Sequence, residues 1–148
     1  MTEQELKAFT RTVMDYFSSV SGTAPVLGMP YIKGEQHEVH DFTGVIGVSG
    51  SRRGGVYLTT GRELLTAFGS CILGDEPLDD EGLYDLIGEM TNTIAGNIRE
   101  VFGSTFLISV PIIVKGRIEE IVMRLKPPVF VIPITWKGHR CNLAIGLE

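Results

Sequence analysis

Cysteine is scarce in this sequence of 148 residues, and the two that occur, Cys71 and Cys141, lie far apart along the chain. Two cysteines can form neither a disulfide framework nor a four-cysteine zinc site. We therefore expect two buried thiols in a reducing cytosol, because free cysteine usually serves as a small core residue.

Long hydrophobic runs and an excess of positive charge are also missing. No stretch approaches the roughly 18–20 apolar residues of a membrane span. The first five residues, MTEQE, are polar and acidic, unlike the basic, then apolar, start of a signal peptide. The net charge is −5, which disfavours binding to nucleic acid or to anionic lipid. These absences predict a soluble cytoplasmic protein that binds neither nucleic acid nor membrane.

The length suits a single domain spanning residues 1–148, and 18 glycines with 7 prolines indicate many turns. Hydrophobic spacing predicts helices over the first 21 residues, over about 60–73 and over about 80–102. The expected strands are 39–48, 55–59, 106–115, 117–125, 129–136 and 140–147, with 23–40 as an irregular connection. Such runs of strands favour an α+β fold with two layers, a mainly antiparallel sheet packed by two long helices and a short one.

Helix boundaries are marked by capping residues. Thr2 with Glu5, and Thr60 with Glu63, have the spacing of a capping box, in which each side chain satisfies a free backbone N–H. Gly22 is the expected end of the first helix. That helix is expected to bury one stripe, formed by Leu6, Phe9, Val13, Phe17 and Val20.

The helix over 80–102 has two unlike faces when its residues are placed at about 100° intervals. The expected core face comprises Leu83, Leu86, Ile87, Met90, Ile94, Ile98 and Val101. The opposite face carries Asp85, Gly88, Glu89, Asn92, Gly96 and Arg99.

That second face is locally unfavourable to the helix. A glycine inside a helix costs about 0.5–1 kcal/mol relative to alanine, and Asp85 and Glu89 are like charges one turn apart. Bare backbone at Gly88 and Gly96 would let another molecule approach closely. The pattern is therefore compatible with a docking surface, although a solvated polar face is the commoner explanation.

The spacing Asp85-x-x-x-Glu89-x-x-Asn92, followed by Gly96, resembles the signature of the CheC/CheX/FliY family of chemotaxis phosphatases. The resemblance is most specific over residues 86–97, LIGEMTNTIAGN. Pro111 resembles the motif proline of the family, at a shorter spacing from Asn92 than in the longer form of the motif. The first helix has no second E-x-x-N, so the sequence is most similar to the CheX type, which has one motif.

The resemblance implies an enzyme that removes phosphate from the aspartate of a CheY-type response regulator. Asn92 would orient the attacking water, because an amide both donates and accepts hydrogen bonds. Glu89 would pair with the active-site lysine of the regulator, and Asp85 would support docking. Gly88 and Gly96 would let loops of the regulator lie against the helix. Phosphoryl transfer depends mainly on positioning and charge, so no nucleophile is needed in this chain.

The resemblance also implies that the protein has no cofactor of its own and forms a homodimer through its sheet. A Mg²⁺ ion would belong to the acidic pocket of the regulator. Three alternatives remain open: a non-catalytic module that binds a regulator or another protein, a small-ligand sensor with an apolar pocket, and direct binding of Mg²⁺ by Asp85 and Glu89.

Other clusters point less clearly to function. Residues 35–41 contain His37 and His40 among three acidic residues, but their spacing places the histidines on opposite faces of a strand. The glycines between residues 44 and 55 lie between two strands and lack the lysine of a P-loop, so we expect a hairpin. Arg52 and Arg53 are expected to be solvated at its tip, and Trp136 is expected to be in the core or an interface.

Overall fold

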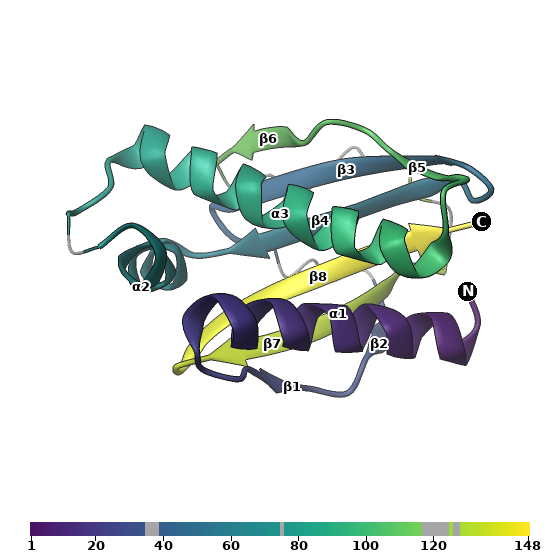
Figure 1. Cartoon of the computed structure of the whole chain (residues 1–148), viewed down its shortest axis with the longest axis horizontal. Helices are drawn as coiled ribbons and strands as arrows, with labels where there is room; N and C mark the ends of the chain where they lie inside the picture. The colour runs from purple at the N-terminus through teal and green to yellow at the C-terminus, as the bar shows by residue number, and fades with distance from the viewer. Residues whose placement is uncertain (35–38, 75, 117–124, 126–127) are drawn as a thin grey trace.

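Two long helices lie side by side across one face of an antiparallel sheet in this computed structural model, which describes residues 1–34, 39–74, 76–116, 125 and 128–148 (Figure 1). The helices are α1 (Glu3–Ser21), α2 (Arg62–Leu73) and α3 (Asp80–Phe102). The strands are β1 (Val26–Leu27), β2 (Tyr31–Ile32), β3 (Phe42–Gly50), β4 (Gly54–Thr60), β5 (Phe106–Ile108), β6 (Ile112–Lys115), β7 (Phe130–Trp136) and β8 (His139–Leu147).

The strand order is β1-β7-β8-β4-β3-β5, with β2 also pairing with β7 and β6 also pairing with β3. Every pairing between the described strands is antiparallel. Helix α3 packs on the β3–β4 half of the sheet, α1 lies over the β7–β8 half, and α2 closes one end (Figure 1). The predicted two-layer α+β architecture is confirmed.

The core lies between the helices and the sheet. The rings of Phe17, Phe68 and Trp136 pack together, with Trp136 lying 5.3 Å from Phe68 and 6.3 Å from Phe17 between centroids. Trp136 is fully buried, as predicted, and its indole N–H donates to the Ser21 hydroxyl at 3.0 Å. One buried polar group therefore ties the end of α1 to the end of β7.

Two residues that were expected in the core, Val20 and Val101, are exposed instead. In each case the residue one position later takes the inward place. The Ser21 hydroxyl bonds to Trp136, and the ring of Phe102 lies 5.5 Å from that of Phe9. A helix has 3.6 residues per turn, so the next inward position after Phe17 or Ile98 can be three or four residues further on. In both helices the residue four positions on faces inward, and the valine three positions on is exposed.

The helix ends follow the capping predictions in two of three cases. Thr2 and Glu5 form the expected capping box, and Gly22 ends α1 with a left-handed φ of 75°. The second predicted box is wrong, because Thr60 is the last residue of β4 and its hydroxyl donates to the Arg140 carbonyl. Gly61 is the N-cap of α2 and makes no side-chain cap hydrogen bond.

The outer strands differ from the sequence prediction. Residues 23–40, expected to be irregular, contribute β1 and β2 to the sheet. The predicted strand over 106–115 is divided into β5 and β6 by residues 109–111, because Pro111 has no N–H for the ladder. The predicted strand over 117–125 falls, apart from Leu125, outside the described residues.

At the break between β5 and β6, Ser109 keeps the chain attached to β3. Its backbone N–H donates to the Gly47 carbonyl at 2.9 Å, and its hydroxyl accepts from the Gly47 N–H at 2.8 Å. Three residues, 109–111, thus lie opposite two residues of β3. This is the arrangement of a β-bulge, which bends the outer strand.

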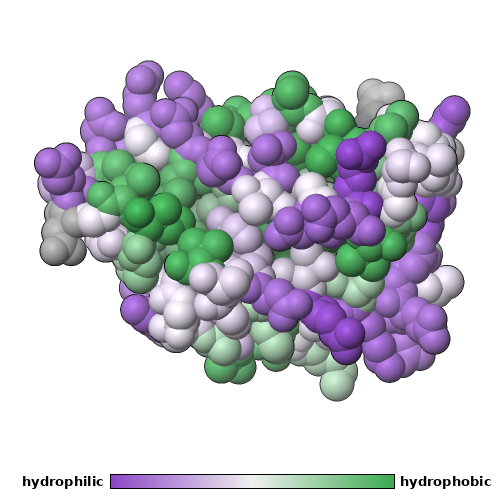
Figure 2. Space-filling view, in the orientation of Figure 1, coloured by the Kyte–Doolittle hydropathy of each residue, from purple (hydrophilic) through white to green (hydrophobic). Residues whose placement is uncertain are grey.

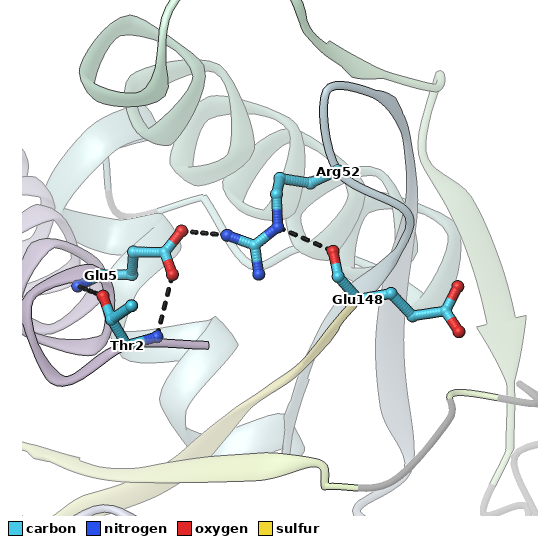
Figure 3. A network of polar contacts seen from close by, with 4 residues as sticks. All are labelled: Thr2, Glu5, Arg52 and Glu148. Atoms are coloured by element: carbon cyan, nitrogen blue, oxygen red, sulfur yellow. Dashed lines mark hydrogen bonds and ion pairs between the residues drawn. The ribbon is translucent and has the colours of Figure 1, made fainter.

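The start of α1 is held to the β3–β4 hairpin by a polar network (Figure 3). The Glu5 carboxylate accepts from the Thr2 N–H at 2.9 Å and pairs with the guanidinium of Arg52. Arg52 Nε in turn donates to the backbone oxygen of Glu148 at 2.7 Å. The expectation that Arg52 is simply solvated is therefore wrong, because it joins α1, the hairpin and the residue after β8.

The depth at which α3 sits on the sheet is set by Gly44 of β3. A Cβ at Gly44 would lie 2.2 Å from the Thr91 hydroxyl and 3.1 Å from the Ile87 carbonyl of α3. Thr91 cannot easily withdraw, because it is buried and its hydroxyl donates to the Ile87 carbonyl at 2.6 Å. The helix backbone therefore rests directly on the strand.

We expect Gly44→Ala to lower the free energy of unfolding by about 1–3 kcal/mol, because the added methyl group overpacks the contact with α3. Denaturant unfolding measures the change. Gly47→Ala on the same strand is the control, because a Cβ there meets the Ser109 side chain at an ordinary 3.5 Å. Equal stabilities of the two variants would contradict this view of the contact.

The Glu5 network predicts a dependence of stability on pH. Desolvation raises the pKa of Glu5, but the Thr2 N–H and the charge of Arg52 outweigh it and hold the pKa below its usual range. A folded-state pKa below the unfolded one gives stability that is present above about pH 4.3 and lost as the pH falls.

Glu5→Gln should therefore cost about 1–2 kcal/mol at pH 7, and the difference from the wild type should shrink toward pH 3. Urea unfolding across this pH range is the measurement. Glu3→Gln, in the same turn but exposed, is the control. A difference that stayed constant with pH would refute the electrostatic origin of the effect.

Candidate functional site

The exposed surface of α3 carries the polar row predicted from the sequence. Asp85, Glu89 and Asn92 are all exposed, and Gly96, one turn further on, is half-buried. The intervening residues Ile87 and Met90 are fully buried in the core. Residues three and four apart are neighbours on a helix surface, so two carboxylates and one amide form a ridge that another molecule can reach.

Gly88 does not belong to this exposed ridge, contrary to expectation. It is buried against β6, where a Cβ would lie 3.0 Å from Cδ1 of Ile113. Its lack of a side chain allows α3 and β6 to pack closely. Gly88 is therefore accounted for by packing inside the chain, whereas a Cβ at Gly96 would meet nothing within 4 Å.

Tyr16 of α1 lies on the flank of the ridge that faces α1. Its side chain is buried, and both this burial and the negative charge of Glu89 raise the pKa of its phenol. The phenol is therefore neutral at physiological pH, and Glu89 has an electrostatic neighbour on a second helix. Tyr16 is not predictable as a neighbour of the site, because the residue spacing within α1 and within α3 does not show which faces of the two helices meet.

The other flank of the ridge is formed by β6 and by the end of β5. The ammonium of Lys115 lies 5.1 Å from the ring centroid of Tyr84, next to Asp85 in sequence. Ile113 packs against Gly88, and Ile108 shares a hollow with Gly96. The bulge at residues 109–111 therefore follows α3 between these two points and passes Asn92.

The bulge contains Pro111, the proline that resembles the motif of the family, together with Val110, which is 79% exposed. The end of α3 is fixed to β5 by Arg99, whose Nε donates to the Phe106 carbonyl at 3.0 Å. The site thus combines an exposed polar helix surface with a rigidly attached rim. Such a surface can orient a water molecule and bind a charged partner, and it offers no activated nucleophile in the described part of the chain.

Other candidate groups are spread over the rest of the molecule. Among the described residues, no three His, Cys, Asp or Glu side chains gather in a way that could hold a metal ion. Glu35, His37 and Glu38 of the histidine cluster lie outside the described residues. Cys141 is buried, and burial raises the pKa of its thiol, but the expectation of burial is wrong for the exposed Cys71.

A separate hollow of about 630 Å³ lies at the opposite edge of the sheet, where β1 and β2 pair with β7. Tyr31, His40, Arg140 and Asn142 contribute polar groups to its lining. Val26, Val39 and Ile134 add apolar surface, so the lining is mixed, whereas the alternative of a small-ligand sensor requires an apolar pocket. In the described part of the chain, no helix combines the length and hydrophobicity that spanning a membrane requires.

The family described as chemotaxis phosphatase CheX matches residues 42–135, which run from the start of β3 into β7 and include all of α3. The chain belongs to the CheX family. The matched part contains the whole polar row and the bulge, so the site lies within the region that defines the family. No curated protein matches the chain at a significant level.

Solved structures agree with membership of the CheX family. The CheX protein of Desulfovibrio desulfuricans is 28% identical, with a TM-score of 0.86 over 98% of this chain and 99% of that one. A CheC-like protein from Shewanella sp. PV-4 is 23% identical, with a TM-score of 0.87 over 100% of this chain and 99% of that one. A CheX–CheY–BeF3–Mg²⁺ complex from Borrelia burgdorferi is 18% identical, with a TM-score of 0.78 over 97% of each chain.

Proposed function

We propose that this protein is a cytoplasmic phosphatase that hydrolyses the aspartyl-phosphate of a CheY-type response regulator. The observation that carries the proposal is the exposed row of Asp85, Glu89 and Asn92 on α3, inside the part of the chain that matches the CheX family. The similar fold of a CheX protein in complex with CheY supports the choice of partner.

In this mechanism the Asn92 amide enters the active site of the regulator and holds a water molecule in line with the phosphorus. The amide N–H₂ donates to the phosphoryl group or the water, and the carbonyl oxygen accepts from the water. An aspartyl-phosphate is already reactive, so positioning of the water supplies most of the acceleration. The water attacks phosphorus, the bond to the aspartate breaks, and inorganic phosphate leaves.

Glu89 and Asp85 fix the position of the regulator. The carboxylate of Glu89 pairs with the active-site lysine of the regulator, and Asp85, one turn away, adds a second negative charge to the docking surface. Tyr16, buried on α1, is close enough to Glu89 for the carboxylate charge to help raise the pKa of the phenol, so the Tyr16 phenol stays neutral beside the site. The protein needs no cofactor of its own, and Mg²⁺ is supplied by the acidic pocket of the regulator.

Asn92→Ala should reduce the rate of regulator dephosphorylation by about 10²-fold, because the water loses its positioning group. Glu89→Ala should weaken binding of the phosphorylated regulator. Loss of labelled phosphate from the regulator is the measurement, and Glu81→Ala, exposed in the first turn of α3, is the control.

Two outcomes would overturn this assignment. Unchanged rates in both Asn92→Ala and Glu89→Ala would show that the row is not the site. Binding of the phosphorylated regulator without any acceleration of phosphate loss by the wild-type protein would establish the alternative, a non-catalytic module that uses the same helix surface.

We also infer that two copies of the chain form a homodimer through their sheets. Exposed apolar residues occur at both edges of the sheet: Met29 and Ile32 at the edge formed by β1 and β2, and Leu107 and Ile112 at the edge formed by β5 and β6. Large apolar side chains gathered at a sheet edge favour contact with another protein surface.

Light scattering should give about twice the 16.2 kDa mass of one chain. Two double variants test the two edges: Met29→Glu/Ile32→Glu at one and Leu107→Glu/Ile112→Glu at the other. The variant at the edge that forms the contact should shift the protein to the monomer, because it would bury two charges in the interface. The variant at the other edge should leave the dimer intact. Ile72→Glu on α2 is the control. A wild-type protein that remains monomeric at high concentration would contradict the dimer.

A further inference from the structure

Gly96 has no explanation in the packing of the residues that the structure describes. It lies inside α3, where a glycine destabilises the helix relative to alanine. A Cβ at this position would have no described atom within 4 Å, and the backbone does not adopt the left-handed φ that favours glycine. By contrast, Gly88 on the same helix is packed against Ile113.

A hollow of about 280 Å³ lies beside Gly96, between the end of α3 and β5. Its lining is Gly96, Arg99, Glu100, Gly103, Ser104 and Ile108. The half-buried side chain of Ile108 gives it an apolar part. A larger residue in place of Gly96 would add atoms to this space, so the glycine keeps the hollow open.

The wall of the hollow is held in place by Arg99. Its Nε donates to the Phe106 carbonyl at 3.0 Å, and its Nη2 lies 3.4 Å from the Ser104 carbonyl. These bonds fix the plane of the guanidinium. A fixed guanidinium plane next to apolar surface is a good surface for stacking of a flat or apolar side chain.

The position of the hollow relates it to the proposed site. Gly96 follows Asn92 by four residues on the same helix, and Ile108 leads directly into the bulge that passes Asn92. The hollow therefore lies one turn from Asn92 on the same surface of α3, within reach of a loop of a molecule that places its phosphoryl group at Asn92.

We propose that the hollow beside Gly96 receives an apolar or aromatic side chain of the response regulator, from a loop next to its phosphorylated aspartate. This inference rests on the proposed function, because it takes the regulator as the occupant. The inserted side chain stacks on Arg99 and contacts Ile108, and it sets the distance between the phosphoryl group and Asn92. Gly96 is thus a specificity-determining position. The glycine lowers the stability of α3, and it does so because the binding surface has to stay open at this point.

Opposite effects on stability and binding distinguish this role from a structural one. Gly96→Ala and Gly96→Gln should each raise the melting temperature by about 1–4 °C, because both residues favour helix and meet open space. Gly96→Gln should raise the dissociation constant for the regulator about tenfold or more by filling the hollow. The probe is a CheY-type regulator that the wild-type protein dephosphorylates, loaded with beryllofluoride and Mg²⁺.

The kinetic signature should be a raised KM for the phosphorylated regulator with kcat largely retained, because Asn92 is untouched. Ser70→Gln, which adds a side chain to an exposed position of α2, is the matched control and should change neither quantity. Wild-type affinity in Gly96→Gln, together with loss of activity in Asn92→Ala, would overturn the role of the hollow and leave the proposed function standing. Absence of phosphatase activity in the wild-type protein toward every CheY-type regulator would overturn both.

Discussion

The direct contact between α3 and β3 at Gly44 determines how the rest of the molecule can be arranged. Because no side chain separates the strand from Thr91 and the Ile87 carbonyl, the helix has one depth and one rotation about its axis. If α3 were rotated about its axis by one residue, Thr91 would point away from Gly44. A larger side chain, Met90 or Asn92, would then lie over Gly44. The exposure of Asp85, Glu89 and Asn92 is thus a consequence of packing on the buried side of the helix. A similar contact at Gly88 and Ile113 fixes the helix relative to β6.

The site also depends on elements that are remote in sequence. Arg99 connects the end of α3 to β5, and Ser109 connects the following bulge to Gly47 of β3. Together these bonds hold the rim of the site rigid while the row itself remains open to solvent. Tyr16 arrives from α1, the other long helix, which is in turn held by the Glu5–Arg52 network (Figure 3). Preorganisation of this kind suits a reaction that is accelerated by positioning.

Much of the fold could be predicted from local signals. The period of apolar residues, the Thr2–Glu5 capping box and the helix end at Gly22 depend on neighbouring residues alone, and the structure contains all three. The errors occur where distant contacts decide. Thr60 has the spacing of a cap but belongs to a strand, because its hydroxyl bonds to Arg140 of β8. Val20 and Val101 fit an apolar period, but the aromatic rings and the indole of Trp136 select the adjacent positions.

The polar row was predictable because a single helix carries it, whereas the surroundings were not. Gly88 and Gly96 look equivalent in sequence, yet one is buried against a strand and the other faces an open hollow. Spacing cannot distinguish them, because the difference lies in β5 and β6, which reach the helix from another part of the chain. The surface of the helical layer also mixes polar and apolar areas: Figure 2 shows a hydrophobic patch at the α2 end, where Ile72 and Leu73 are exposed, and further patches elsewhere on this face.

The division of both sheet edges into short strands affects more than the site. At one edge Gly28 and Pro30 lie between β1 and β2, and at the other Pro111 lies between β5 and β6. Among the residues that the structure describes, none of the four strands at these edges, β1, β2, β5 and β6, is longer than four residues. A long, flat edge would act as a template for unlimited strand addition and fibril growth. This sheet can therefore keep apolar side chains at its margins with little risk of open-ended aggregation.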